Sequence, residues 1–200
     1  MKKAKILFIA VSLLLIPISG ACEPNGWTGN VSVFLGYKNL NEDDWKPVDD
    51  QAEIGFLLDL RPKNWPVNIA IDYLESSEWG FQDTPSPITR IDGSTREINI
   101  GIRKIFEISP TVHPYIGGGV AYIHGEFEIN QFSVSTSSDD DAGTGIWVDA
   151  GVYWFIDRFW NLGWWHLGVD LRYSKAEITL FGTDVEAGGF HAGLLAGFHW

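Results

Sequence analysis

Eight segments of this chain alternate between apolar and polar residues at every second position, and this pattern restricts the fold more than any other feature of the sequence. In the clearest segment, one face carries Trp165, Leu167, Val169, Leu171 and Tyr173, and the other carries His166, Gly168, Asp170, Arg172 and Ser174. A period of two is the repeat of a β-strand with two different faces. The other segments lie at 27–37, 52–61, 67–73, 97–103, 115–122, 146–154 and 190–200. The sequence therefore predicts an all-β protein.

The connections between these segments alternate in length. They are long at 38–51, 75–95, 125–144 and 175–187, and short at "PKNWP", "EISPT" and "DRFWN". Transmembrane barrels have short turns at one end, longer loops at the other, an even strand number and spans of about 9 to 11 residues. We therefore expect an eight-stranded antiparallel up-and-down transmembrane β-barrel. A soluble sandwich or lipocalin-like barrel is the alternative, because alternation alone leaves open which face is inside.

Aromatic residues are sorted between the two ends of the segments. The ends that lead into long connections carry Tyr37, Tyr73, Tyr122 and Tyr173. The opposite ends carry Trp27, Trp154, Trp165, Phe198 and Trp200. Amphipathic rings favour the boundary between hydrocarbon and water, and a bilayer has two such boundaries. This sorting favours the transmembrane alternative.

The amino terminus indicates secretion. Lysines precede an apolar run at 6–16, and "SGA" supplies the small residues of a cleavage site, so residues 1–21 are predicted to be a signal peptide. Residues 22–200 would then form one barrel domain. Cys22 is the sole cysteine, which excludes a disulfide within the chain and makes this residue a candidate for lipidation.

Acidic residues dominate the chain. Three of its 14 basic side chains lie in the predicted signal, and the remaining 11 face 26 acidic ones. This balance excludes a nucleic-acid partner, which would require clustered Lys and Arg. The long connections, with the directly adjoining Arg96, hold 17 of the acids beside five bases, Lys38, Lys46, Arg90, Arg96 and Lys175. The run "SSDDDAGTG" lacks a complete calcium-loop pattern, so we expect no metal or other cofactor there and a solvated, mobile surface instead.

Three stretches, "HPYIGGGVAYIHG", "LGVDLRYS" and "GGFHAGLLAGFHW", resemble the small outer-membrane β-barrels of Gram-negative bacteria, such as the OmpA transmembrane domain, OmpX and porin-family proteins. The resemblance covers the whole mature chain. It implies a monomer among the lipids of the cell outer membrane, with a structural or surface-interaction role and loops available to an external ligand or surface. It also implies that the last strand is read by the barrel-assembly machinery.

The polar faces of the segments predict a charged interior. Its members are Glu53, Asp59, Arg61, Asp72, Glu97, Arg103, Asp149, His166, Asp170 and Arg172. An eight-stranded barrel has room only for its own side chains, so these charges must pair, and Asp170 is placed to pair with Arg172. A plugged interior is the expected result, and a narrow cation-conducting channel is the alternative.

Catalytic residues are sparse in the sequence. His166 and Asp170 share a face but lie about 13 Å apart along a strand. "LRYSKAE" looks like the serine region of a lipid A deacylase, yet Arg172 occupies the position where that family has histidine. We therefore expect no enzyme, with a lipid A-modifying activity as the remaining alternative.

Overall fold

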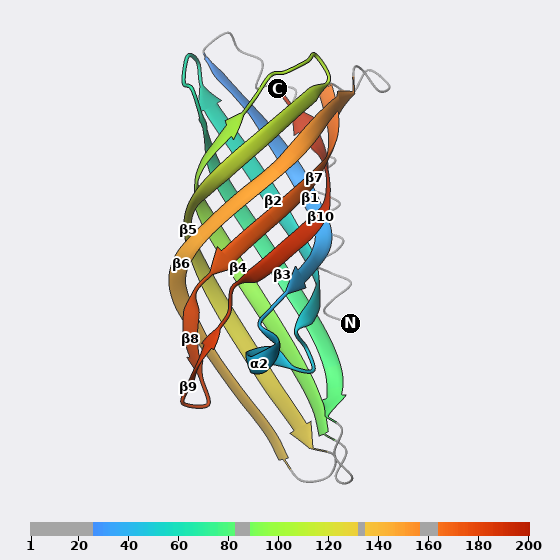
Figure 1. The fold of residues 1–200 in the computed structure, drawn as a ribbon, viewed down its shortest axis with the longest axis vertical. Coiled ribbons are helices and arrows are strands. Elements are labelled where there is room, and N and C mark those ends of the chain that lie inside the picture. Colours follow the sequence, from blue (N-terminus) through green and yellow to red (C-terminus); the bar gives the residue numbers. More distant parts are fainter. Residues whose placement is uncertain (1–25, 83–88, 132–134, 157–163) are drawn as a thin grey trace.

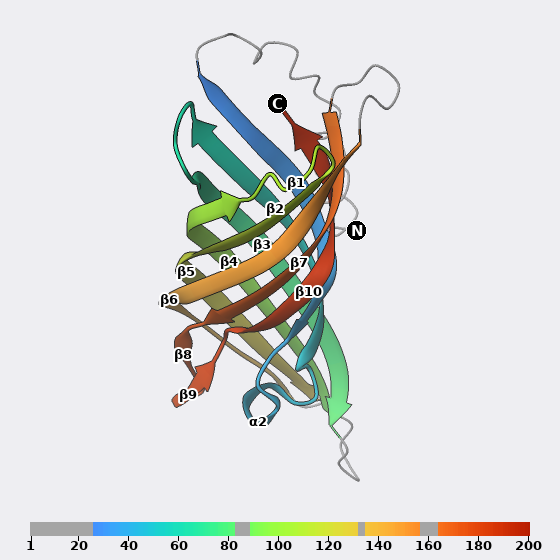
Figure 2. The same ribbon diagram turned by 45° about the horizontal axis from the view of Figure 1, so that its top comes forward.

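A computed structural model describes residues 26–82, 89–131, 135–156 and 164–200. Eight long strands close into an antiparallel barrel in the order β1-β10-β7-β6-β5-β4-β3-β2, as Figures 1 and 2 show. The strands are β1 (Trp27–Asn39), β2 (Asp50–Pro62), β3 (Asn68–Gln82), β4 (Thr89–Ile105), β5 (Val112–Gln131), β6 (Ser135–Ile156), β7 (Trp164–Lys175) and β10 (Gly189–His199). The predicted eight-stranded fold is confirmed. The predicted signal peptide at 1–21 and Cys22 lie outside the described residues.

The first and last strands close the barrel. β1 pairs with β10 from Asn30 opposite His199 to Asn39 opposite Phe190. Beyond this ladder, Gly29 and Trp200 exchange two backbone hydrogen bonds of 3.1 Å each. A Cβ atom at Gly29 would lie only 2.7 Å from the Trp200 ring, so glycine is what allows the indole to pack there. The apolar alternation of 190–200 therefore forms a seam of the barrel.

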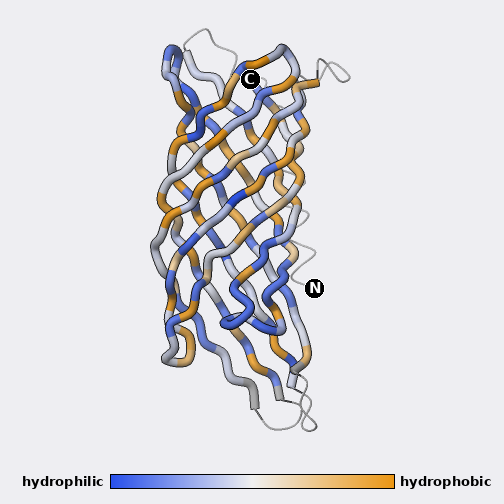
Figure 3. The backbone as a smooth tube through the Cα atoms, in the orientation of Figure 1, coloured by the Kyte–Doolittle hydropathy of each residue, from blue (hydrophilic) through white to orange (hydrophobic). Residues whose placement is uncertain are grey.

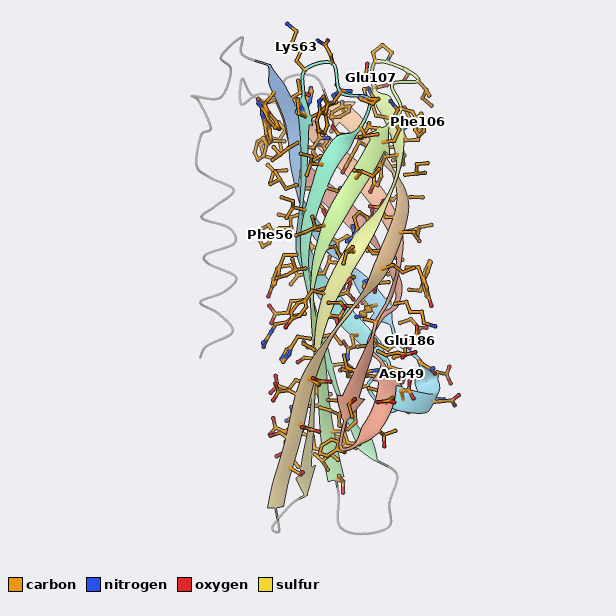
Figure 4. All side chains as sticks on the ribbon, turned by 90° about the vertical axis from the view of Figure 1, so that its left-hand side faces the viewer. Asp49, Phe56, Lys63, Phe106, Glu107 and Glu186 are labelled. Atoms are coloured by element: carbon orange, nitrogen blue, oxygen red, sulfur yellow. The ribbon has the colours of Figure 1, made fainter. Side chains whose placement is uncertain are left out.

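The apolar face of each strand points away from the barrel axis. Leu35 and Leu194, opposite each other on β1 and β10, are 59% and 65% exposed. The same belt includes Ile71, Ile98, Ile100, Ile102, Ile116, Val120, Ile146, Val148, Leu167 and Leu171. Figure 3 shows the alternation along the strands, and Figure 4 shows Phe56 on the outer side of the barrel. Soluble proteins do not expose a continuous apolar band of this size, so the soluble alternative is wrong.

Aromatic side chains mark both edges of this belt. Tyr37, Tyr73, Tyr122 and Tyr173 are exposed along the edge of the belt that faces the predicted long connections. At the other end, Trp27 and Trp154 are exposed. There the Trp165 and Phe198 rings lie 3.9 Å apart on paired strands. These edges divide the molecule into a membrane-spanning part and two ends. We call the end with the short turns the periplasmic end and the opposite end the extracellular end, which is the orientation typical of such barrels.

Two of the predicted long connections are mostly strand. β5 has 20 residues and β6 has 22, and their pairing continues to Gln131 opposite Ser135. β3 and β4 likewise remain paired to Gln82 opposite Thr89. The expectation of long loops at 75–95 and 125–144 was wrong, because polar residues continue the same hairpins beyond the membrane. We call the extensions of β3–β6 at 75–82, 89–96, 124–131 and 135–142 the wall (Figures 1 and 2).

The other two long connections fold inward against the wall, and we call them the cap (residues 40–49 and 176–187). The cap contains α2 (Glu42–Trp45) and the hairpin of β8 (Glu177–Leu180) and β9 (Thr183–Glu186). Trp45, Val48, Ile178 and Leu180 are buried with Ile91, Ile123 and Trp147 of the strands. Figure 4 shows Asp49 and Glu186 of the cap at the opposite end from Lys63 and Glu107. Within the described ranges, no helix has the length and apolar character that crossing a membrane requires.

Candidate functional site

The middle of the barrel is filled by a cluster of buried ion pairs around Arg103. Its guanidinium donates to Asp149 at 2.9 Å, to Asp59 at 2.7 Å and to Asp72 at 2.8 Å. Arg172 donates to the same Asp72 oxygen at 2.7 Å. These side chains are almost completely buried. A charge buried in this way is stabilised only by such partners.

Strand register and one glycine bring this cluster together. Arg103 of β4 pairs with Gly117 of β5, which in turn pairs with Asp149 of β6. A Cβ atom at Gly117 would lie 2.4 Å from Asp149 Oδ1. The missing side chain therefore leaves the space in which an arginine reaches a carboxylate two strands away.

Two tyrosines that were not among the predicted interior residues complete the cluster. Tyr115 donates to Asp170 at 2.6 Å, Tyr153 donates to Asp59 at 3.0 Å, and the two rings stack at 4.6 Å. Their position on the polar face of each segment was the available signal. The expected pairing of Asp170 with Arg172 is present, with 3.6 Å between Oδ1 and Nε.

A second buried cluster lies between the first one and the cap. Lys38 Nζ donates to Glu97 at 2.5 Å, to Thr95 at 2.8 Å and to the Ala187 carbonyl of the cap at 2.8 Å. The assignment of Lys38 to an external loop was wrong. β1 continues two residues past Tyr37, and the strand period turns Lys38 into the interior.

The same cluster contains an arrangement of serine, histidine and glutamate. Ser174 Oγ lies 3.0 Å from His191 Nε2, and His191 Nδ1 lies 2.9 Å from Glu53 Oε2. This is the order of nucleophile, base and orienting acid. However, all three side chains are buried, and Ser174 Oγ also lies 3.1 Å from Glu97 Oε1. The sequence pattern did not indicate this arrangement, since its residues come from three separate strands.

Two predicted interior residues lie away from both clusters. His166 is buried nearer the periplasmic end, with Nε2 2.7 Å from Ser32 Oγ. Arg61 is near the periplasmic end of β2, where its side chain is 33% exposed and 3.4 Å from Glu107. The expectation that Arg61 joins the buried network was wrong, because it stands where the strand leaves the barrel.

The acidic run at 139–141 belongs to β6 and holds the cap. Asp139 accepts a hydrogen bond from Phe181 N at 2.6 Å, and Asp141 accepts one from Thr179 N at 2.8 Å. Asp140 points to the other face, where it lies 3.8 Å from His124. Backbone N–H donors lower the pKa of the Asp141 carboxyl. The run is therefore part of a strand and not of a loop, and two of its three carboxylates bind the β8–β9 hairpin.

In the described parts of the chain, no group of three or more His, Cys, Asp or Glu side chains could hold a metal ion. A polar hollow lies elsewhere, on the outer face of the wall. It has a volume of about 740 Å³ and is bordered by side chains of β3, β4 and β5.

No family model matches the sequence, and no curated protein does. Among solved structures, the chain is similar to Ail, the attachment invasion locus protein of Yersinia pestis, in its complex with the heparin analogue sucrose octasulfate. The identity is 14% and the TM-score 0.53, over 86% of this chain and 99% of that chain. OprG from Pseudomonas aeruginosa matches at 13% identity and a TM-score of 0.48, over 88% of this chain and 96% of that chain. This chain has the fold of the small eight-stranded β-barrels of bacterial outer membranes, and its exposed apolar belt fits the same setting.

Proposed function

We propose that this chain is a closed outer-membrane barrel that does not conduct ions. It presents the wall and the cap, which together form an ordered acidic head, to partners outside the cell. The observation that carries this proposal is the apolar cap above a filled interior. Trp45 and Ile178 of the cap pack with Trp147 of the strands. Below them, Lys38 and Arg103 are fully buried in ion pairs.

The cap is attached at several points, which supports a permanent closure. Trp45 Nε1 donates to the Glu186 carbonyl at 2.8 Å, and Glu186 N donates to Asp44 at 3.0 Å, so α2 and β9 are joined. From the barrel interior, Lys38 Nζ donates a hydrogen bond to the Ala187 carbonyl of the cap. From the wall, Asp141 accepts one from Thr179 N. An ion crossing the barrel would have to displace both the apolar layer and the buried pairs, so a cation channel is disfavoured.

The charge of the head supports a cationic partner. The outer connections hold 17 acids in the sequence, and the burial of Lys38 leaves four bases, Lys46, Arg90, Arg96 and Lys175, to balance them. Such a field attracts positive groups and repels polyanions. The partner chemistry therefore differs from the sulfated ligand in the Ail structure. We infer a cationic peptide or protein surface as the partner.

Binding to the barrel in bilayer nanodiscs tests this inference, with poly-L-lysine and heparin as probes. We expect poly-L-lysine to bind with an affinity that falls as salt rises, and heparin not to bind. Asp43→Asn on α2 should weaken binding by about twofold, the effect of one charge roughly 8 Å away in water. Glu107→Gln at the opposite end is the control. Preferential binding of heparin would contradict the proposal.

We further propose that Ser174, His191 and Glu53 act in stability and not in catalysis. A substrate has no open approach to side chains that are buried under the cap. The carboxylate of Glu97 beside Ser174 Oγ opposes the negative charge that a reacting serine develops. A fluorophosphonate probe should leave Ser174 unlabelled in the folded barrel, and labelling that is lost in Ser174→Ala would show that the site is catalytic.

A further inference from the structure

The hollow on the outer face of the wall has no part in the closure of the barrel. Along its border, β3, β4 and β5 contribute outward residues such as Trp79, Arg90 and Glu126, all on the face opposite the cap. Figures 1 and 4 show that these strands run beyond α2 and the β8–β9 hairpin. The hollow therefore opens sideways from the barrel, over the neighbouring membrane surface.

The pairing register of β3, β4 and β5 determines how far the hollow lies above the lipid. Tyr73, Ile98 and Tyr122 form one outward row at the edge of the apolar belt. Arg96 stands in the next outward row, and Trp79 is six residues past Tyr73 on β3. At about 3.3 Å per residue and a tilt of about 40°, these positions lie roughly 5 and 15 Å above the tyrosines. The polar layer of one leaflet is about 5 to 8 Å thick, so the hollow spans it and the layer above.

Aromatic rings border the hollow at the end farthest from the lipid. Trp79 is 54% exposed, and its ring lies 5.7 Å from that of Phe81, which is also exposed. The Arg90 guanidinium sits 5.2 Å from the Trp79 ring centre. An exposed indole with a fixed neighbour offers a flat apolar surface at low entropic cost. The ring of a sugar has an apolar C–H face that packs on such a surface.

Polar groups that suit hydroxyls lie below the rings. Arg96 Nε is 3.6 Å from Glu75, and its NH2 group is 4.0 Å from Glu126. These separations are longer than hydrogen bonds, so water or a ligand can lie among the three groups. A hydroxyl donates to a carboxylate and accepts from a guanidinium.

The charge of the hollow selects among ligands that reach this position. Five acids border it against two arginines: Glu75, Glu78, Asp92, Glu126 and Glu128 against Arg90 and Arg96. This excess of negative charge disfavours phosphate and sulfate. We propose that the hollow binds the uncharged sugars of the glycolipid that lies beside the barrel in the outer leaflet. This site is separate from the proposed contact with cationic partners, because it faces along the membrane.

The test uses the barrel in nanodiscs and the NMR signal of the Trp79 indole, assigned with Trp79→Phe. One disc contains lipopolysaccharide with its core sugars, a second contains lipid A without core sugars, and a third contains phospholipid only. We expect the Trp79 signal to shift in the first disc alone. A shift of equal size with lipid A would indicate a phosphate site and overturn the proposal, as would no shift in any disc.

Variants and a soluble probe separate the remaining outcomes. Arg96→Gln and Glu126→Gln should each reduce the sugar-dependent shift several-fold, whereas Glu177→Gln, in the cap, should leave it unchanged. Heat-modifiable gel mobility confirms that each variant still forms a barrel. If maltoheptaose added to the phospholipid disc produces the full shift, the source is a free saccharide and the glycolipid assignment is wrong.

Discussion

Arg103 Nε lies 2.9 Å from Asp149 Oδ2 although the two residues stand on strands separated by β5. Gly117 between them has no side chain to block the contact. This relationship explains why a buried arginine is tolerated at the centre of so narrow a barrel. It also determines how the barrel responds when one partner is removed.

Arg103→Met should destabilise the barrel more than any single aspartate substitution in the same cluster. Two arginines form the ion pairs of four buried acids there, so loss of Arg103 leaves carboxylates without a cationic partner. We expect the free energy of unfolding to fall by about 3–5 kcal/mol, and by less for Asp149→Asn. Urea titration of the folded fraction in detergent, read by gel mobility, measures both. A larger loss in Asp149→Asn would contradict this account.

Gly117→Ala should also destabilise the barrel, because the new methyl group would contact Asp149 and displace the ion pair. We expect a loss of about 1–3 kcal/mol, as for other overpacked interiors. Gly118→Ala is the matched control, since residue 118 points outward and its Cβ would meet no atom closer than 3.1 Å. The same urea titration applies, and equal effects at both positions would show that the space at Gly117 is unimportant.

Trp45→Ala should loosen the cap while the transmembrane barrel remains folded. The indole is fully buried and joins α2 to β9 through its hydrogen bond. Removal of a buried tryptophan lowers the free energy of unfolding by about 3–5 kcal/mol, and here we expect the cap to lose this stability. Hydrogen exchange in residues 176–187 should become faster, with little change in β7 and β10. Trp79→Ala is the control, and unchanged exchange in Trp45→Ala would indicate that other contacts hold the cap.

The attachment of the β8–β9 hairpin to the wall should weaken in acid. Hydrogen bonds from Thr179 N and Ala142 N lower the pKa of Asp141 below its usual value of 3.8. The stabilisation that the Asp141 carboxylate gives to the hairpin is therefore complete above that value. It is lost as the pH falls through the lowered pKa. Protection of the Thr179 amide, relative to its intrinsic exchange rate at each pH, should fall below about pH 4, and Asp141→Asn should remove most of this dependence. Asp140→Asn should retain it, and the opposite order would refute the assignment.

The alternation of residues predicted the strands and the direction of their side chains well. Leu171 faces the lipid and Arg172 faces the interior, as one period-two segment implies. The cap was not predictable in this way, because Trp45 lies in a short polar segment whose burial depends on a distant hairpin. The contact of Ser174 with His191 depends on the register between β7 and β10, which residue patterns alone do not define.

The external connections show the same limit. Their polar composition resembled that of solvated loops, yet Asp139 and Asp141 lie in a paired strand and bind the cap. Amino-acid composition indicates which residues are exposed to water. Whether those residues are ordered depends on strand pairing, which composition does not show. Lys38 was misplaced for the related reason that the strand end lay beyond the last apolar residue of its segment.

Single-channel recording in a planar bilayer tests the closed barrel most directly. The purified chain should insert and give no conductance steps above background at neutral pH, because the cap and both buried clusters block the interior. Insertion is verified by protease protection of the same preparation. Reproducible conductance steps from the folded chain would contradict the account.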